Sequence, residues 1–404
     1  MKRTAIAAVA FTLSSMTIAA HAQNSVTLYG LIDAGIGYVH NADSNNNLTG
    51  MINGNLSGDR WGLKGSEDLG GGLKTIFALE SGFDVGTGKM GQGSRLFGRQ
   101  AYVGFEGDKW GTVTLGRQYD PITDTVQAVT ADNYFGSTFA TPGDVDNNDN
   151  SARVSNAVKY VSPNYAGFQF EGLYAFSGVA GQTGQGYTYS GAATYSVGGL
   201  SLAAGYLRAT NNSATGGRTS WASSTTDSIF DSHINDGYVS AKSVSIAQLG
   251  GQYVLGSVTL GASYSNTQLK ADASSNFSTT EKYNSGKAFV AYQATPALIA
   301  GVGYAYTAAS GDTSAHYHQV SLGADYNLSK RTDLYAVAAY QHANGTQRLS
   351  DGTTQAAQAS IGSYGYNGTS TQEIAIVGIR HKFWCIASDK ARMRHSACGF
   401  FYGF

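Results

Sequence analysis

Apolar and polar residues alternate with a period of two along most of this 404-residue chain, and that alternation limits the possible folds more than any other feature. Near the start, Val26, Leu28, Ile32 and Ala34 share one parity, although the glycines between them make the alternation incomplete. Successive side chains of a β-strand point to opposite faces, so a period of two indicates strands with one apolar and one polar face. The sequence therefore predicts an all-β protein.

The connections between the predicted strands alternate between short turns and long polar segments. Single-chain outer-membrane barrels have short turns on the periplasmic side, long loops outside and an even number of strands, and the count here is about sixteen. The short turns contain Gly, Pro, Asn or Ser and lie at 108–111, 162–167, 197–199, 255–257, 294–296 and 328–331. The long segments lie at 41–58, 84–93, 116–153, 178–186, 209–242, 270–282, 309–315 and 342–371. The fold predicted is a 16-stranded antiparallel transmembrane β-barrel.

The composition agrees with strands that face lipid on one side and water on the other. Only 13% of the residues are charged, whereas a soluble protein carries about a quarter. Aromatic residues recur near the predicted strand ends, Tyr29 and Tyr335 among them, and this favours aromatic belts at the membrane interfaces. A soluble β-sandwich or a secreted adhesin is the alternative, but its outer faces would carry more charge.

The N-terminal residues indicate export. Lys2 and Arg3 precede an apolar run that ends in Ala-His-Ala at 20–22. A short basic start, an apolar stretch and an A-x-A site are typical of a secretory signal peptide. We predict a signal peptide at 1–22, with a buried N-terminal helix as the alternative, and a β-barrel at 23–383.

The C-terminal residues depart from the pattern. The alternation ends at Phe383, and residues 384–404 carry both cysteines, Cys385 and Cys398, with a basic cluster. We interpret 384–404 as an atypical extension. The alternative is an added hairpin closed by a disulfide between the two cysteines.

The long segment 116–153 is rich in acids and interrupts the strands early in the chain. It contains two of the four prolines and is bounded by Arg117 and Arg153. We expect it to fold into the bore of the barrel, where its acids would face arginines of the wall. Its acids include Asp120, Asp124, Asp132, Asp144 and Asp146.

Five short stretches, in this order, resemble general porins of Gram-negative bacteria of the β-proteobacterial type. They are 26–30 (VTLYG), 60–70 (RWGLKGSEDLG), 99–105 (RQAYVGF), 116–119 (GRQY) and 377–383 (VGIRHKF). The resemblance covers residues 1–383. It implies an outer-membrane homotrimer of 16-stranded barrels, each with loop 3 folded into the pore, that lets ions and small hydrophilic solutes diffuse passively without a cofactor.

The resemblance also implies a charged constriction. By motif position, Arg60, Arg99 and Arg153 match the wall arginines of the family. An arginine on the lipid face of a barrel costs about 2–4 kcal/mol at mid-bilayer, so strand arginines should face water. Opposed charges across a narrow pore filter ions by charge, and the selectivity stays open. The predicted constriction comprises Arg60, Arg99, Arg117, Arg153, Asp120, Asp124 and Asp132, whereas Asp144 and Asp146 are predicted to lie in a solvated loop exit.

The remaining features argue against other functional classes. A net charge of −1 disfavours nucleic-acid binding, and the partners expected are outer-membrane lipid, lipopolysaccharide, other copies of the chain and small solutes. No histidine lies in a catalytic motif, and His316 and His318 alone make a poor metal site. We therefore predict neither an enzyme nor a metalloprotein. The alternative is a barrel that acts as a surface adhesin, a receptor or a barrel enzyme, since fold alone does not decide function.

Overall fold

A computed structural model of the chain describes residues 25–383, except 182–183, 213–217, 219–220 and 222–223. The predicted signal peptide at 1–22 and the extension at 384–404 lie outside the described residues. None of the helices in the described part is long and apolar enough to cross a membrane.

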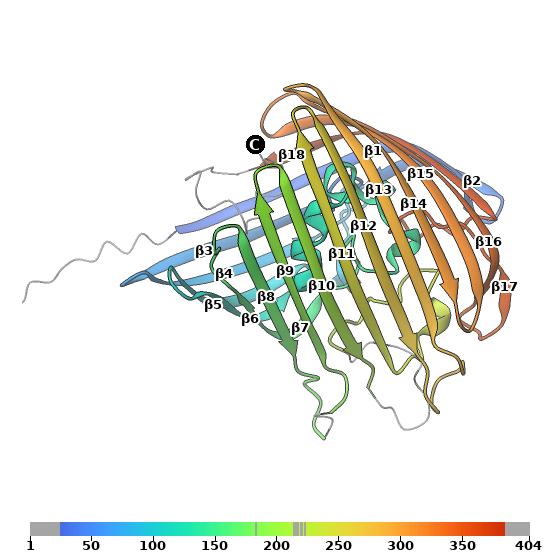
Figure 1. The fold of residues 1–404 in the computed structure, drawn as a ribbon, viewed down its shortest axis with the longest axis horizontal. Coiled ribbons are helices and arrows are strands. Elements are labelled where there is room, and N and C mark those ends of the chain that lie inside the picture. The colour runs from blue at the N-terminus through green and yellow to red at the C-terminus, as the bar shows by residue number, and fades with distance from the viewer. Residues whose placement is uncertain (1–24, 182–183, 213–217, 219–220, 222–223, 384–404) are drawn as a thin grey trace, which may run out of the picture.

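Antiparallel strands make up most of the described chain (Figure 1). The eighteen strand segments are β1 (Ser25–Asp43), β2 (Asn46–Asn53), β3 (Arg60–Gly70), β4 (Leu73–Gly82), β5 (Gln100–Gly107), β6 (Gly111–Gln118), β7 (Val154–Val161), β8 (Phe168–Ala175), β9 (Thr188–Val197), β10 (Leu200–Thr210), β11 (Ser243–Leu255), β12 (Val258–Lys270), β13 (Glu281–Thr295), β14 (Leu298–Ser310), β15 (Ser314–Asn327), β16 (Thr332–Arg348), β17 (Thr354–Ala356) and β18 (Thr371–Phe383). The helical turns are α1 (Gly91–Ser94), α2 (Pro121–Thr125), η1 (Gln127–Val129), α3 (Asp132–Phe135), η2 (Gly136–Phe139), η3 (Pro142–Asp144) and η4 (Asp236–Tyr238).

The sheet closes on itself because β18 returns to β1, with Gly30 opposite Phe383. Two wall strands are each made of two segments. β2 and β3 pair with successive parts of β1, and β17 and β18 pair with successive parts of β16. The eighteen segments therefore form sixteen wall strands, and the predicted antiparallel barrel is confirmed.

All the short turns predicted from the sequence join consecutive strands; β9 and β10, for example, are connected through Gly198 and Gly199. Three predicted long loops are shorter than expected. Segment 41–58 contains β2, and β16 continues to Arg348 inside segment 342–371. Segment 309–315 is reduced to residues 311–313, because β14 ends at Ser310 and β15 begins at Ser314. The prediction fails there because the parts of strands that project beyond the membrane have water on both faces. Polar residues in those parts therefore do not end the backbone pairing.

The two faces of the wall differ as the alternation predicts. Val26, Ile36 and Val377 are among many exposed apolar side chains on the outer face. Most of the aromatic residues assigned to belts are exposed there too, but Tyr29 and Tyr335 are each only 4% exposed and point inward. Both hydroxyls donate to buried carboxylates, those of Glu80 and Asp33, which draws the rings into the barrel.

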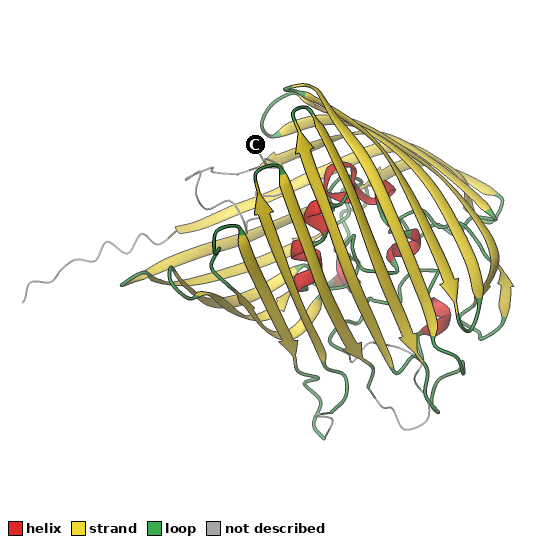
Figure 2. Ribbon diagram, in the orientation of Figure 1, coloured by secondary structure: helices red, strands yellow, loops and turns green. Residues whose placement is uncertain are grey.

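Residues 119–153, here called the inward segment, pack against the inner face of the wall (Figure 2). Their helical turns contact β9, β10, β11, β14, β15 and β16. Burial of a large apolar side chain contributes about 1.5–3 kcal/mol, so several of them together anchor the segment. The anchoring side chains are Ile122, Val126, Val129, Phe135 and Phe139, which pack on Leu207, Ile246, Phe289 and Val337.

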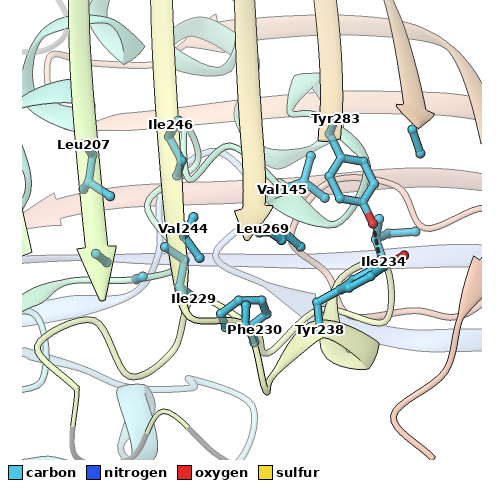
Figure 3. Close-up of a cluster of buried hydrophobic side chains, with 14 of the residues drawn as sticks. Val145, Leu207, Ile229, Phe230, Ile234, Tyr238, Val244, Ile246, Leu269 and Tyr283 are labelled. Carbon is cyan, nitrogen blue, oxygen red and sulfur yellow. Dashed lines mark hydrogen bonds between the residues drawn. The ribbon is translucent and has the colours of Figure 1, made fainter. Parts of the chain in front are cut away.

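A second stretch, 228–241, packs on the same apolar side chains as the inward segment (Figure 3). It lies nearer to the long connections. Ile229, Phe230 and Ile234 pack with wall residues such as Leu207 and with Val145 of the inward segment. The Tyr283 hydroxyl of β13 donates to the Ile234 carbonyl oxygen at 2.8 Å. The interior is thus filled on the side of β9–β16 and remains open on the opposite side.

Candidate functional site

A cavity of about 690 Å³ lies between the inward segment and the inner faces of β1 and β3–β8. Both of its sides are charged. The wall contributes Tyr29, Arg60, Lys64, Arg99, Tyr102, Lys159 and Glu171, and the inward segment contributes Tyr119, Asp124, Asp132, Asp144, Asp149 and Arg153.

Arg99 is held by a buried carboxylate on the neighbouring strand. Its Nε donates to Glu80 Oε1 at 2.7 Å, and its Nη2 donates to the Tyr119 hydroxyl at 2.7 Å. The Tyr119 hydroxyl donates to the same carboxylate at 2.8 Å, and the Tyr29 hydroxyl donates to its other oxygen at 2.9 Å. Glu80 is fully buried. The charge of Arg99 is therefore balanced within the wall.

Arg60 and Arg153 lack such a partner. Arg60 Nε donates to the Gly58 carbonyl at 2.9 Å, and Arg153 Nη1 donates to the Ser151 carbonyl at 3.0 Å. Among the described residues, no carboxylate lies within 4.0 Å of either guanidinium. The Arg153 guanidinium lies 5.6 Å from the centre of the Tyr119 ring. Burial, reinforced by the positive charge of Arg99, lowers the pKa of Arg153 to about 9.

Two acids of the inward segment, Asp124 and Asp132, pair with lysines rather than with the predicted arginines. Asp124 forms an ion pair with Lys159 of β7, which is also 3.6 Å from Glu171 of β8. Asp132 accepts from Lys287 Nζ of β13 at 3.1 Å. These pairs cross from the segment to the wall, so they fix the segment and cancel its charge at the same time.

Asp120 lies outside the cavity lining because it caps α2. Its carboxylate accepts from the backbone N–H groups of Ile122 at 2.8 Å and Thr123 at 3.3 Å, and from Asn147 Nδ2 at 3.0 Å. Capping by Asp directly before a proline at the first helical position is a common helix start. Burial raises the pKa of this carboxyl. Its position indicates a structural role and not the predicted one of facing an arginine.

Arg117 also lies outside the cavity lining. Its Nε donates to the Gly98 carbonyl at 2.7 Å and its Nη1 donates to Ser155 Oγ at 2.7 Å, while Asp227 is 4.0 Å away. Arg117 of β6 therefore joins the connection before β5 to strand β7 and lies close to the connection between β10 and β11. Five of the seven predicted positions, Arg60, Arg99, Arg153, Asp124 and Asp132, do meet at the cavity.

The predicted solvated loop exit is wrong for Asp144 and Asp146, since both are buried. Asp144 accepts from the N–H groups of Asp149 at 2.8 Å and Ser151 at 3.0 Å, so the run folds back on itself. Side chains of Asp and Asn bond the backbone a few residues on, which makes such runs compact. Burial, and then the nearby Asp149, raises the pKa of Asp144, and burial raises the pKa of Asp149 to about 6.

Sequence reasoning missed Glu80, Lys159 and Lys287, which lie within strands. The sequence does indicate that they face the interior, because a charged residue inside a membrane-spanning strand should not face lipid. Their partners could not be identified, since Lys287 and Asp132 are 155 residues apart in the chain.

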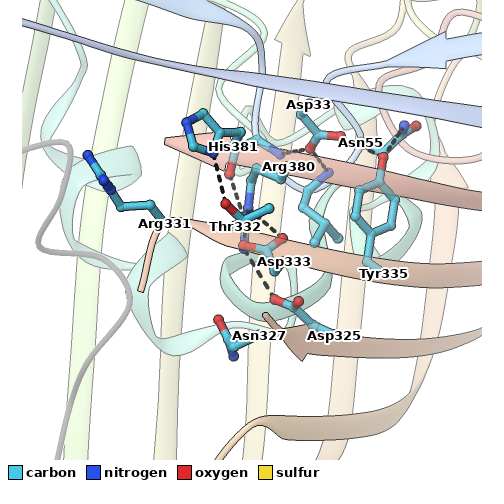
Figure 4. Close-up of polar contacts among 12 residues, drawn as sticks. Asp33, Asn55, Asp325, Asn327, Arg331, Thr332, Asp333, Tyr335, Arg380 and His381 are labelled. Carbon is cyan, nitrogen blue, oxygen red and sulfur yellow. Dashed lines mark hydrogen bonds and ion pairs between the residues drawn. The ribbon is translucent and has the colours of Figure 1, made fainter. Parts of the chain in front are cut away.

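A buried ionic cluster supports the edge of the cavity (Figure 4). Arg380 Nε donates to Asp333 Oδ1 at 3.1 Å and its Nη2 donates to Asp325 Oδ2 at 3.2 Å. Arg380 Nη1 also donates to Ser57 Oγ at 3.0 Å. Two residues before Ser57, the Asn55 carbonyl accepts from the Ser137 N–H at 3.1 Å. The interruption between β2 and β3 thus connects the cluster to the inward segment.

Comparison with known proteins gives a consistent result. A sequence profile described as Gram-negative porin matches residues 4–346. Outer membrane porin protein 32 of Delftia acidovorans is 31% identical over 404 aligned residues, which span 95% of this chain and 100% of that protein. An outer membrane porin of Bordetella pertussis is 43% identical over 192 residues, 44% of this chain and 49% of that protein. The solved anion-selective porin from Comamonas acidovorans has a TM-score of 0.67 at 26% identity, and the match covers 89% of this chain and 100% of that chain.

Proposed function

Because the chain belongs to the Gram-negative porin family, we propose that the cavity between the inward segment and β3–β8 is the constriction of its diffusion path. The protein is an outer-membrane porin, a water-filled channel for passive diffusion of ions and small hydrophilic solutes. Arg60 and Arg99 of the wall and Arg153 at the end of the inward segment supply the positive charges of the proposed constriction, and Asp124 and Asp132 of the inward segment supply the negative charges.

We further propose that the constriction favours anions. One observation carries this proposal: Arg60 and Arg153 lack a carboxylate partner in the described part of the chain, whereas Asp124 and Asp132 are each paired with a lysine. Uncompensated positive charge in a narrow pore raises the local concentration of anions. The name of the Comamonas relative, an anion-selective porin, is in keeping with this preference.

The proposal includes two properties of the whole assembly. Family membership favours a homotrimer, which chemical cross-linking of the purified protein would show as a three-chain species. It also favours a channel without catalytic activity over the alternatives of an adhesin, a receptor or a barrel enzyme. Assays of lipase and protease turnover on the same preparation test this point.

Recording from planar bilayers is the decisive experiment. The purified protein should give stepwise conductance, and a salt gradient should produce a reversal potential with the sign of anion preference. Stepwise channels with cation preference would contradict the proposed constriction, and enzymatic turnover without channels would contradict the porin function itself.

A further inference from the structure

Three glutamines form a row across the inner face of the wall, on the adjacent strands β15, β16 and β18. Gln319 lies opposite Gln341, and Gln341 lies opposite Gln372. All three are buried, whereas the neighbouring residues Val320 and Tyr340 are exposed on the outer face. Successive side chains of a strand point to opposite faces, so the three amides point into the barrel. The first two are joined directly, because Gln341 Nε2 donates to Gln319 Oε1 at 2.7 Å.

One end of this row, here called the glutamine ladder, holds the inward segment. Gln319 Nε2 donates to the Thr138 carbonyl at 2.9 Å and to the Ala140 carbonyl at 3.2 Å. Ser321, two residues further along β15, donates its hydroxyl proton to the same Thr138 carbonyl at 2.5 Å. Both acceptor residues are fully buried, and buried carbonyl groups need hydrogen-bond partners. The end of η2 is therefore fixed to β15 by directional bonds.

The rest of the ladder holds residues 357–363 of the connection between β17 and β18, here called segment 357–363. The Gln341 side chain bonds both backbone groups of Ser360, since Oε1 accepts from the N–H at 2.7 Å and Nε2 donates to the carbonyl at 3.3 Å. Gln372 Oε1 accepts from the N–H of the fully buried Ile361 at 2.8 Å. Segment 357–363 is thus fixed by the same row of amides that fixes the inward segment.

The two segments also contact each other at the cavity. The Gly143 N–H donates to the Ser360 carbonyl at 3.1 Å. The Ser363 hydroxyl is hydrogen-bonded to the Asp149 carboxylate, and its oxygen lies 3.3 Å from Ser137 Oγ. Ser137, Asp149 and Ser363 line the cavity. A shift of one segment relative to the other would therefore change the shape of the proposed constriction.

The ladder gives direction to an attachment that is otherwise largely apolar. The inward segment packs on the wall through side chains such as Phe135 and Phe139, and hydrophobic attraction is non-directional. Hydrogen bonds have narrow ranges of distance and angle, so the amides define where the segment stops along the wall. None of the three glutamines lines the cavity itself. Their effect on a passing solute must act through the backbone groups that they hold.

We propose that Gln319, Gln341 and Gln372 are positioning residues of the channel, which hold the inward segment and segment 357–363 in one arrangement and thereby set the width of the constriction. The inference rests on the proposed function, because it takes the cavity to be the constriction. Of the three, Gln341 alone bonds both to Gln319 and to segment 357–363. Loss of its amide leaves buried partners unsatisfied, which costs more than the net contribution of a hydrogen bond.

The test compares the uptake of a trisaccharide, raffinose, with that of a monosaccharide, arabinose, by liposomes that contain the purified full-length protein. In Gln341→Met, which replaces the amide by a thioether of similar length, the ratio of raffinose to arabinose uptake should rise roughly two-fold, because passage through a pore depends on its diameter. Gln293→Met near the short-turn end of β13 is the matched control. The Gln293 amide donates to the Thr295 carbonyl, far from both segments in the chain, and its loss should leave the ratio unchanged.

Gln372→Met tests the connection between the two segments. Gln372 bonds segment 357–363 and lies at the end of the ladder away from the inward segment. Its replacement should also raise the uptake ratio, through the shift of segment 357–363, and it provides the result if Gln341→Met gives too little folded protein. An unchanged ratio in Gln372→Met would overturn the inference.

A reversible cross-link distinguishes positioning from a general loss of stability. The serine oxygens at 137 and 363 are close enough for a disulfide between cysteines at the same positions. Ser137→Cys/Ser363→Cys, made together with Cys385→Ser/Cys398→Ser and oxidised with diamide, joins the two segments. This oxidised protein should have the same uptake ratio with and without Gln341→Met, and dithiothreitol should restore the raised ratio. A ratio that stays raised in the oxidised Gln341→Met variant would contradict the role of the ladder.

The same measurements separate this inference from the proposed function. If the unchanged protein takes up neither sugar, the proposed function fails. If it takes up arabinose and both Gln341→Met and Gln372→Met have its uptake ratio, only the role of the glutamine ladder fails.

Discussion

Arg99 Nε lies 2.7 Å from Glu80 Oε1, with the two side chains 7% and 0% exposed. This pair neutralises one of the three arginines that line the channel, and among the described residues it leaves Arg60 and Arg153 without a carboxylate partner. The difference among the three arginines determines what each substitution should do.

Replacing Arg153 by glutamine should shift the selectivity toward cations. A unit charge about 4 Å from a passing ion contributes about 1 kcal/mol in water, so the anion-to-cation permeability ratio should fall roughly two- to five-fold. The reversal potential in a salt gradient measures this ratio. Arg331→Gln, in a short turn outside the channel, is the control.

Replacing Glu80 by glutamine should destabilise the barrel. The change leaves the buried Arg99 guanidinium without its counter-charge, and breaking a buried ion pair costs about 3–5 kcal/mol. The midpoint of thermal unfolding in detergent should drop clearly. Glu67→Gln changes the same charge at an exposed position of β3 and should leave the midpoint nearly unchanged. Similar midpoints for the two variants would show that the pair contributes little.

Acidification should increase the preference for anions through Asp149. Its pKa is raised to about 6 by burial, so the carboxylate is charged at pH 8 and largely protonated at pH 5. Loss of this negative charge from the channel lining makes the net charge of the lining more positive. Asp149→Asn should remove this part of the pH dependence between pH 8 and 5, and Asp68→Asn at an exposed position of β3 should not. Identical pH profiles for wild type and Asp149→Asn would contradict the assignment.

Replacing Gly323 by alanine should displace the inward segment. The Phe135 ring lies directly over Gly323 and its cross-strand partner Gly301, and a Cβ at either position would collide with the ring. We expect a larger and noisier single-channel conductance. The matched control is Gly286→Ala on β13, where a Cβ meets no atom within 4 Å. Unchanged conductance in Gly323→Ala would show that Phe135 does not position the segment.

Part of the site could be predicted from residue type and parity. Arg60, Arg99 and Arg153 line the cavity, as expected of arginines that cannot face lipid. Asp120 was misassigned, although Asp before Pro121 is itself a helix-start signal that could have indicated a cap. Acidic character alone does not distinguish a carboxylate that caps a helix from one that faces the pore.

The sequence by itself determined the barrel, its strand number and the direction in which most side chains point, because a period of two together with alternating connection lengths leaves few other folds. Only the tertiary structure decided which charges remain uncompensated. Ion pairing depends on distances of a few ångströms between residues such as Asp132 and Lys287, which approach only when the inward segment packs on the opposite wall. Parity shows that both face the interior, but it does not show which partner each one meets.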